Sequence, residues 1–162
     1  MNCRMPELKR ALERGGFTEV RTVISSGNAV FTSRAASDAS LEKRCEAAMA
    51  RHLGNAFLTI VRPIDALAEL LEREAFRRIE VPAGAKRVLT FLRGKPRAGL
   101  TFPVSIAGAS ILAVHGREVY SVYDPADYNN KFMVLIEKTF GTAVTTRTWE
   151  TVVRIVKAAR QS

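Results

Sequence analysis

Apolar residues at helical spacing mark five stretches of the chain. Near its start, Leu8 and Leu12 belong to one apolar stripe, which closes on two glycines that allow a helix to end. Ser37 or Asp38 is placed to cap a second helix, and Thr148 is placed to cap the last one. The pattern predicts helices over residues 5–16, 37–54, 63–74, 131–141 and 148–160.

Short runs rich in Val, Ile, Thr and Phe lie between these helices. Such runs are typical of strands when Gly, Pro, Asn or Ser bound them. Residues 94–110 contain two Pro and three Gly, so we expect irregular structure there. The pattern predicts strands over 19–25, 29–33, 56–62, 86–93 and 142–147, and a hairpin over 111–124 that turns at His115 and Gly116.

The expected order of elements is α-β-β-α-β, one helix, β-(irregular)-β-β-α-β and a last helix. Each half approximates the β-α-β-β-α-β plan of ferredoxin-like domains. We therefore expect an α+β protein with two ferredoxin-like halves, the first lacking its opening strand. The expected boundaries are 1–62 for the N-terminal half, 63–84 for a linking helix and loop, and 85–162 for the C-terminal half.

Composition places the chain among ordinary globular proteins, with 47% hydrophobic and 25% charged residues in a length of 162. There is no apolar stretch near membrane length and no secretory signal, so we expect a cytoplasmic protein. Cys45 and Trp149 fall on apolar helix faces and are expected in the core. With two Cys, two His and no Cys-x-x-Cys, we expect no metal and no cofactor.

Net charge changes this picture, because most of it lies in the second half. Residues 1–80 hold 13 Lys/Arg and 11 Asp/Glu, whereas residues 81–162 hold 12 and 5, so the net charges are +2 and +7. Clustered basic charge attracts phosphate groups and acidic surfaces. The alternative is a basic protein with no polyanionic partner. The cations considered for polyanion binding are Arg87, Arg93, Lys95, Arg97, Arg154, Lys157 and Arg160.

The step Ser-Ser-Gly-Asn at 25–28 separates the first two expected strands. Gly and Asn tolerate positive φ, which tight hairpin turns require, so a turn accounts for both residues. A second interpretation is that the side chains of Ser26 and Asn28 and the N–H of Gly27 face a bound anion. The sequence has no Gly-x-Gly-x-x-Gly or P-loop pattern, so no nucleotide-binding fingerprint supports that interpretation.

Asn130 and Lys131 stand at the start of an expected helix. A helix N-terminus presents free N–H groups and a partial positive charge, so both residues are candidate anion ligands. Asn130 is equally suited to cap the helix. Arg147 stands before the last expected helix, where it either clamps an anion or pairs with Asp124 or Asp127.

Other chemistry finds little support in the sequence. We interpret Glu118, Asp124 and Asp127 as solvated loop residues, because acid–base work needs carboxylates whose pKa values have been split by burial or contact. His52 and His115 have no neighbouring Ser or Cys arrangement that suggests a nucleophile. The aromatic strand signature of single-stranded RNA readers is absent, so base-specific recognition is not expected.

Four blocks of the sequence are similar to one family: MPELKRALERGGFTEVRT at 5–22, ISSGNAVF at 24–31, REVYSVYDP at 117–125 and NKFMVLIEKTFGTAVTTRTWETV at 130–152. Together they resemble the bacterial domain of unknown function 1697 family, along nearly the whole chain. The last block is the most specific. The resemblance implies an α+β protein of two ferredoxin-like halves and implies no reaction.

Members of that family open with an apolar strand that runs into a Gly-rich, Arg-containing turn before the first helix. This chain starts directly at that helix, so the resemblance implies an N-terminally shortened member. Three explanations are open: the start lies downstream of the natural one, another chain supplies the strand, or the gene is degenerate. A missing central strand also predicts self-association through an unpaired strand edge.

These features favour binding of a phosphate-bearing ligand or a nucleic-acid backbone by the basic C-terminal half. The expected partners include no membrane. One alternative is a small-molecule enzyme with a site at the Ser-Gly-Asn turn. The other is a structural or interaction domain with no ligand.

Overall fold

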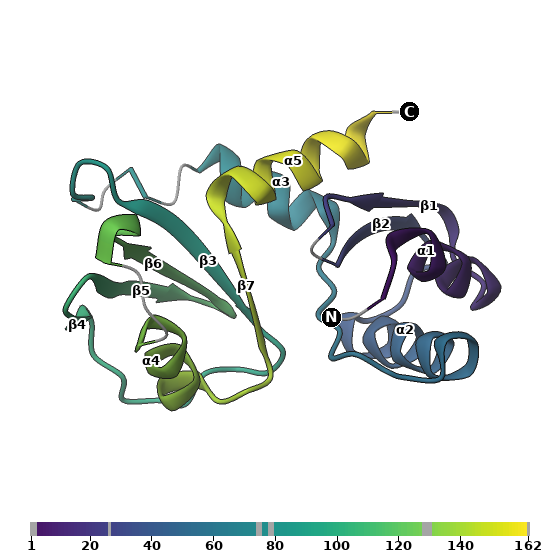
Figure 1. Cartoon of the computed structure of the whole chain (residues 1–162), viewed down its shortest axis with the longest axis horizontal. Coiled ribbons are helices and arrows are strands. Elements are labelled where there is room, and N and C mark those ends of the chain that lie inside the picture. The colour runs from purple at the N-terminus through teal and green to yellow at the C-terminus, as the bar shows by residue number, and fades with distance from the viewer. Residues whose placement is uncertain (1–2, 26, 74–75, 78–79, 128–130, 162) are drawn as a thin grey trace. The chain divides into compact units, whose positions relative to one another are not determined.

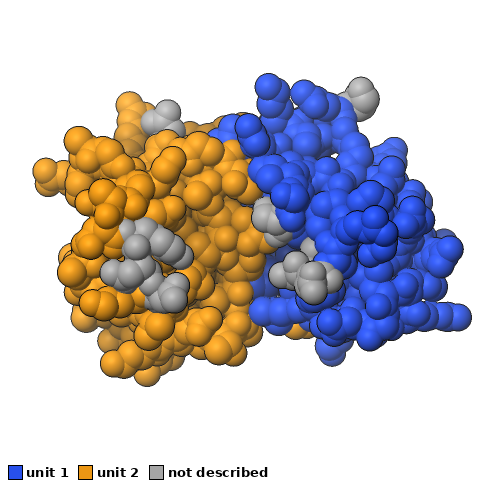
Figure 2. Space-filling model, in the orientation of Figure 1, with its two compact units in different colours: residues 1–68, 153–162 blue, residues 69–152 orange. Residues whose placement is uncertain are grey.

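Figure 1 shows the computed structural model of the chain, which describes residues 3–25, 27–73, 76–77, 80–127 and 131–161. The described residues form an α+β fold with five α-helices and two antiparallel sheets, of two and five strands. Two compact units share them, residues 1–68 with 153–162 and residues 69–152 (Figure 2). The α+β class expected from the sequence is confirmed.

The first unit packs two helices on a β-hairpin. Its elements are α1 (Met5–Arg14), β1 (Thr18–Val23), β2 (Asn28–Thr32) and α2 (Asp38–Leu53). The two strands pair antiparallel, as the apolar pattern predicts. Helices α1 and α2 approach each other so closely at Gly15 that a Cβ added there would lie 2.6 Å from the Cβ of Ala48. The buried core of this unit consists of Leu8, Leu12, Phe17, Val20, Cys45, Met49 and Val61.

The ends of α2 follow the local chemistry of its sequence. The Ser37 hydroxyl accepts a hydrogen bond from the N–H of Ser40 at 3.1 Å, which satisfies one of the N–H groups that lack a helical partner. Gly54 closes the helix with a φ of 74°, a left-handed conformation that glycine adopts without strain. Both ends confirm the boundaries expected from the sequence.

The strand expected over 56–62 does not form. Two carboxylates of α2 take the place of a strand partner for this segment. Glu42 Oε2 accepts from the N–H of Val61 at 2.9 Å, and Glu46 Oε2 accepts from the N–H of Thr59 at 3.2 Å. The segment therefore lies along α2, where side chains satisfy these two N–H groups in place of a strand–strand hydrogen-bond ladder.

The second unit is built on a five-stranded antiparallel sheet with the order β4-β5-β6-β3-β7. Helix α4 packs on one face, where the buried residues Val88, Leu92, Ile111, Val119, Phe132 and Ile136 form a core. The elements are β3 (Lys86–Leu92), β4 (Val104–Ile106), β5 (Ala109–His115), β6 (Glu118–Tyr123), a 3-10 turn η1 (Pro125–Asp127), α4 (Lys131–Phe140) and β7 (Val144–Thr148). Two further helices, α3 (Ile64–Glu72) and α5 (Trp149–Arg160), contribute residues to both units.

Aromatic residues cover part of the opposite face of this sheet. Phe76 lies 5.5 Å from the ring of Tyr120 and 5.5 Å, edge-on, from the ring of Trp149. The guanidinium of Arg87 lies over the Trp149 ring at 5.2 Å. Trp149, expected in the core, is only half-buried, and the Arg87 cation covers part of its ring.

The division into compact units differs in one respect from the expected halves. It falls within α3, inside the expected linking region 63–84. Residues 153–162, however, belong to the first unit, although the sequence groups them with the C-terminal half. Residues 94–110, expected to be irregular, contain the short strand β4 and no helix.

Candidate functional site

The turn between β1 and β2 holds the Ser-Gly-Asn step. Gly27 has a φ of 86°, and Asn28 is 7% exposed with its side-chain amide donating to the Val23 carbonyl at 3.1 Å. Ser26 lies outside the described residues. The turn interpretation accounts for Gly27 and Asn28. Anion binding by Ser26, Gly27 and Asn28 stays a prediction.

Ile24 is a feature of this turn that sequence reasoning missed. Its φ is 60°, and its side chain is 39% exposed. The left-handed region is strained for a β-branched residue, so the fold holds Ile24 against its own preference. No local sequence pattern predicts such backbone strain, because isoleucine is an ordinary strand residue.

Lys131 is the first residue of α4, and its side chain is exposed. The first four N–H groups of a helix have no partner within it, and they carry the positive end of the helix dipole. The ammonium of Lys131 adds a full charge to this end. Asn130, the other candidate here, lies outside the described residues.

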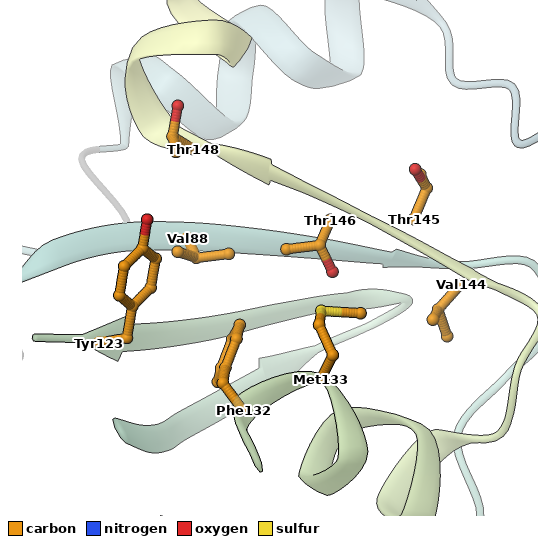
Figure 3. A pocket seen from close by; sticks show the side chains of 8 residues that line it. All are labelled: Val88, Tyr123, Phe132, Met133, Val144, Thr145, Thr146 and Thr148. Atoms are coloured by element: carbon orange, nitrogen blue, oxygen red, sulfur yellow. The ribbon is translucent and has the colours of Figure 1, made fainter. Parts of the chain in front are cut away.

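A pocket of about 410 Å³ opens beside the first turn of α4 (Figure 3). Phe132 and Met133 of that turn form one wall, and the edge strand β7 forms the other. The lining combines aliphatic and aromatic side chains with four hydroxyls, and it contains no carboxylate. Its residues are Val88, Tyr123, Phe132, Met133, Val144, Thr145, Thr146 and Thr148.

The hydroxyls on β7 differ in what they contact. Thr146 shares a hydrogen bond of 3.0 Å with Thr90, and Thr148 caps α5 by accepting from the N–H of Thr151 at 3.3 Å. Thr145 accepts from the guanidinium of Arg147 at 2.6 Å, so its own proton points elsewhere. The cap at Thr148 confirms the start expected for the last helix.

Ser121 lies beside this pocket on β6. The sheet register pairs it with Val88, and alternation along the strand places it on the same face as Tyr123. Ser121 is 0% exposed, and its hydroxyl has no hydrogen-bond partner among the described residues. A buried polar group without a partner is rare in a native fold and calls for an explanation.

Arg147 lies on β7 between two pocket threonines. It pairs in register with Leu89, so alternation places it on the sheet face opposite Thr146. Its guanidinium donates to the Thr145 hydroxyl and, at 2.9 Å, to the Thr146 carbonyl. Burial lowers the pKa of Arg147 below its ordinary value, because removing water disfavours the charged form.

The structure brings the predicted site residues together only in part. Gly27 and Asn28 belong to the first unit, whereas Lys131 and Arg147 belong to the second. Within the second unit, Lys131 precedes the pocket wall at Phe132, and Arg147 reaches the pocket edge through Thr145. The alternative that Arg147 pairs with Asp124 or Asp127 stays a prediction.

Other titratable side chains of the second unit make local contacts. Asp124 accepts from the N–H of Ala126 at 2.9 Å, as expected of a loop residue. His115 lies 3.3 Å from the guanidinium of Arg73, a contact between distant segments that sequence reasoning missed. Among described residues, no group of three His, Cys, Asp or Glu is placed to hold a metal ion. No described helix is long and apolar enough to cross a membrane.

Comparison with known proteins gives a structural likeness and a family. The conserved bacterial protein SP0830 from Streptococcus pneumoniae superposes with a TM-score of 0.64 at 18% identity, covering 99% of this chain and 91% of that one. At this identity the likeness shows the fold alone. A search of the curated proteins found no match. The family model described as "Protein of unknown function (DUF1697)" matches residues 1–120. The chain therefore belongs to the DUF1697 family.

Proposed function

We propose that this DUF1697 protein binds a phosphate-bearing ligand or a nucleic-acid backbone through its second unit. One observation carries the proposal: Lys131 opens α4 directly beside a pocket that has no carboxylate in its lining. The second unit, residues 69–152, holds 12 Lys/Arg and 9 Asp/Glu, and this net charge of +3 raises the local concentration of anions around the site.

The chemistry at the start of α4 suits a phosphate. Free N–H groups of a first helical turn and a neighbouring ammonium are the donors that phosphate oxygens accept from. The hydroxyl of Thr146 lies across the pocket and adds a neutral donor. We propose binding and no reaction at this site.

Lys131→Glu tests the proposal. We expect it to weaken binding of a fluorescent single-stranded oligonucleotide several-fold and to reduce the salt dependence of binding, because one phosphate contact is lost. Fluorescence anisotropy between about 50 and 200 mM salt measures both effects.

Lys138→Glu is the matched control, since this lysine lies exposed in the last turn of the same helix. It changes the net charge equally but lies far from the helix start. An equal loss of affinity in both variants would show that binding depends on net charge and not on a site at Lys131. Binding without any salt dependence would contradict the proposal.

We also propose that the second unit is a ferredoxin-like half. Four neighbouring strands of its sheet have the order β5-β6-β3-β7, which agrees with a split β-α-β arrangement. In this assignment β4 belongs to the connection between β3 and β5. An experimental structure with a different strand order would contradict this assignment.

A further inference from the structure

We propose that the exposed face near the C-terminal end of α5, together with one cation of β1, binds the sugar–phosphate backbone of duplex nucleic acid. This surface, the α5 stripe, consists of Arg154, Lys157, Arg160 and Arg21. All four residues belong to the first unit (Figure 2), so the α5 stripe is not part of the site proposed at α4.

Helical spacing places three of these cations on one face of α5. Arg154, Lys157 and Arg160 follow one another at intervals of three residues, and side chains at this interval are neighbours on a helix surface. All three are exposed, whereas Val152 and Val156 on the other side of the helix are 1% and 8% exposed. The apolar face of α5 is therefore buried in the fold, and its basic face is open to solvent.

The fold adds a fourth cation from a distant part of the sequence. Arg21 is exposed on β1, and its guanidinium donates to the backbone carbonyl of Gln161, the residue that directly follows α5. The carbonyl is neutral, so this hydrogen bond leaves the charge of Arg21 in place. The carboxylate nearest to Arg21 in the sequence, that of Glu19, accepts from the Thr32 hydroxyl at 2.8 Å. Arg21 therefore extends the α5 stripe beyond the end of the helix.

The charges of the α5 stripe are not neutralised within the fold. Residues 153–161 contain three cations and no Asp or Glu. Among the residues that the structure describes, none of the four cations of the α5 stripe forms a salt bridge. Like charges that gather on one surface repel one another and attract anions, so an anionic partner relieves this repulsion.

The spacing of the cations suits a phosphate backbone. A helix rises about 1.5 Å per residue, so successive cations of α5 are about 4.5 Å apart along its axis. Each strand of duplex DNA carries a charge about every 3.4 Å along the duplex axis. The two spacings are similar, so several phosphates can contact the α5 stripe at once. Contacts of this kind do not depend on the base sequence.

Other features of the surface disfavour a lipid partner and single-stranded bases. Helices that lie on membranes insert a broad apolar face, whereas the exposed large apolar residue of α5 is Val153, at 41% exposure. Single strands are held by stacking their bases on aromatic rings, and residues 153–161 contain no aromatic residue. The duplex backbone is therefore the partner that fits the α5 stripe best.

Binding of a fluorescent DNA duplex to the full chain, measured by anisotropy at several salt concentrations, tests the inference. The stripe variant combines Arg154→Gln, Lys157→Gln and Arg160→Gln on an exposed helix face, where such changes alter thermal stability little. We expect its affinity to fall at least about tenfold, and the slope of log affinity against log salt to become shallower by about 2 to 3, because each phosphate contact contributes about 0.9. Arg21→Gln alone should make the slope shallower by about 1.

The matched control combines Arg10→Gln, Lys43→Gln and Arg51→Gln. These three cations are exposed on α1 and α2 of the same unit, and their removal changes the net charge equally. We expect the control to change the slope by less than about 1, because its cations make no phosphate contact. An equal fall in affinity for the control and the stripe variant would overturn the inference, since binding would then follow net charge alone.

The outcomes also separate this inference from the proposed function. A loss of duplex binding confined to the stripe variant and Arg21→Gln supports the inference even if Lys131→Glu leaves oligonucleotide binding unchanged. Duplex binding that is lost in Lys131→Glu and kept in the stripe variant would overturn the inference and leave the proposed function in place. Failure of the natural chain to bind the duplex, or tighter binding to phosphatidylglycerol vesicles than to the duplex, would overturn it as well.

Discussion

Cys45 shows how burial alone changes the chemistry of one side chain. It is 2% exposed among apolar residues of the first unit, as expected from its place on the apolar face of α2. Loss of solvation raises the pKa of its thiol to about 12, and the nearby Arg44 only partly offsets this effect. The side chain therefore acts as a small hydrophobe and not as a nucleophile.

This shift predicts a loss of stability in alkaline solution. The folded chain prefers the protonated thiol, so the stabilisation is complete below the unfolded pKa near 9 and is lost as pH rises toward 12. The free energy of unfolding should fall by up to about 1.4 kcal/mol per pH unit in that window. Urea melts at several pH values measure this fall in the free energy of unfolding. Cys45→Ala, which lacks the thiol, is the reference and should depend less on pH. Parallel slopes for the two proteins would contradict the assignment.

At the scale of elements, α2 does more than cover the hairpin. Glu42 is 1% exposed and holds the N–H of Val61, while the partly exposed Glu46 holds the N–H of Thr59. The two carboxylates lie one helical turn apart, so they contact alternate residues of the extended segment. One helix thereby supplies the hydrogen bonds that a neighbouring strand supplies in a sheet.

Glu42→Ala should lower the free energy of unfolding by about 1–3 kcal/mol, because the N–H of Val61 is left buried without a partner. Glu46→Ala is the matched comparison and should cost less, since its bond is longer and water reaches it. Denaturant melts of both variants provide the measurement. A larger loss for Glu46→Ala would show that the segment is held in another way.

The sequence predicts the helices well, because their signals are local. Ser37, Gly54 and Thr148 mark ends that the structure confirms. The segment 56–62 reads as a strand because its residues suit one, but pairing depends on which neighbour the tertiary structure provides. Here the neighbours are carboxylates of α2, 13 and 19 residues away in the sequence, and no strand propensity encodes that choice.

At the scale of the whole molecule, the pocket and the larger net charge lie in different units. The second unit, residues 69–152, holds 12 Lys/Arg and 9 Asp/Glu, a net charge of +3, whereas residues 1–68 with 153–162 hold 13 and 7, a net charge of +6. Such charges follow directly from composition once the bounds of a unit are known. The pocket does not, because Val88, Tyr123 and Val144 come from three strands that only the sheet order brings together. The sequence singled out Lys131, which directly precedes the wall residue Phe132, but it did not predict the walls.

The central claim is that an anion binds at the first turn of α4. Its most direct test is a titration of the isotope-labelled chain with inorganic phosphate, followed by the backbone amide signals. We expect saturable shifts of the amides of Lys131, Phe132 and Met133, reduced in Lys131→Glu, with those of the last turn of α4 unmoved. Shifts spread evenly over the basic surface, or no saturable shift at the start of α4, would contradict it.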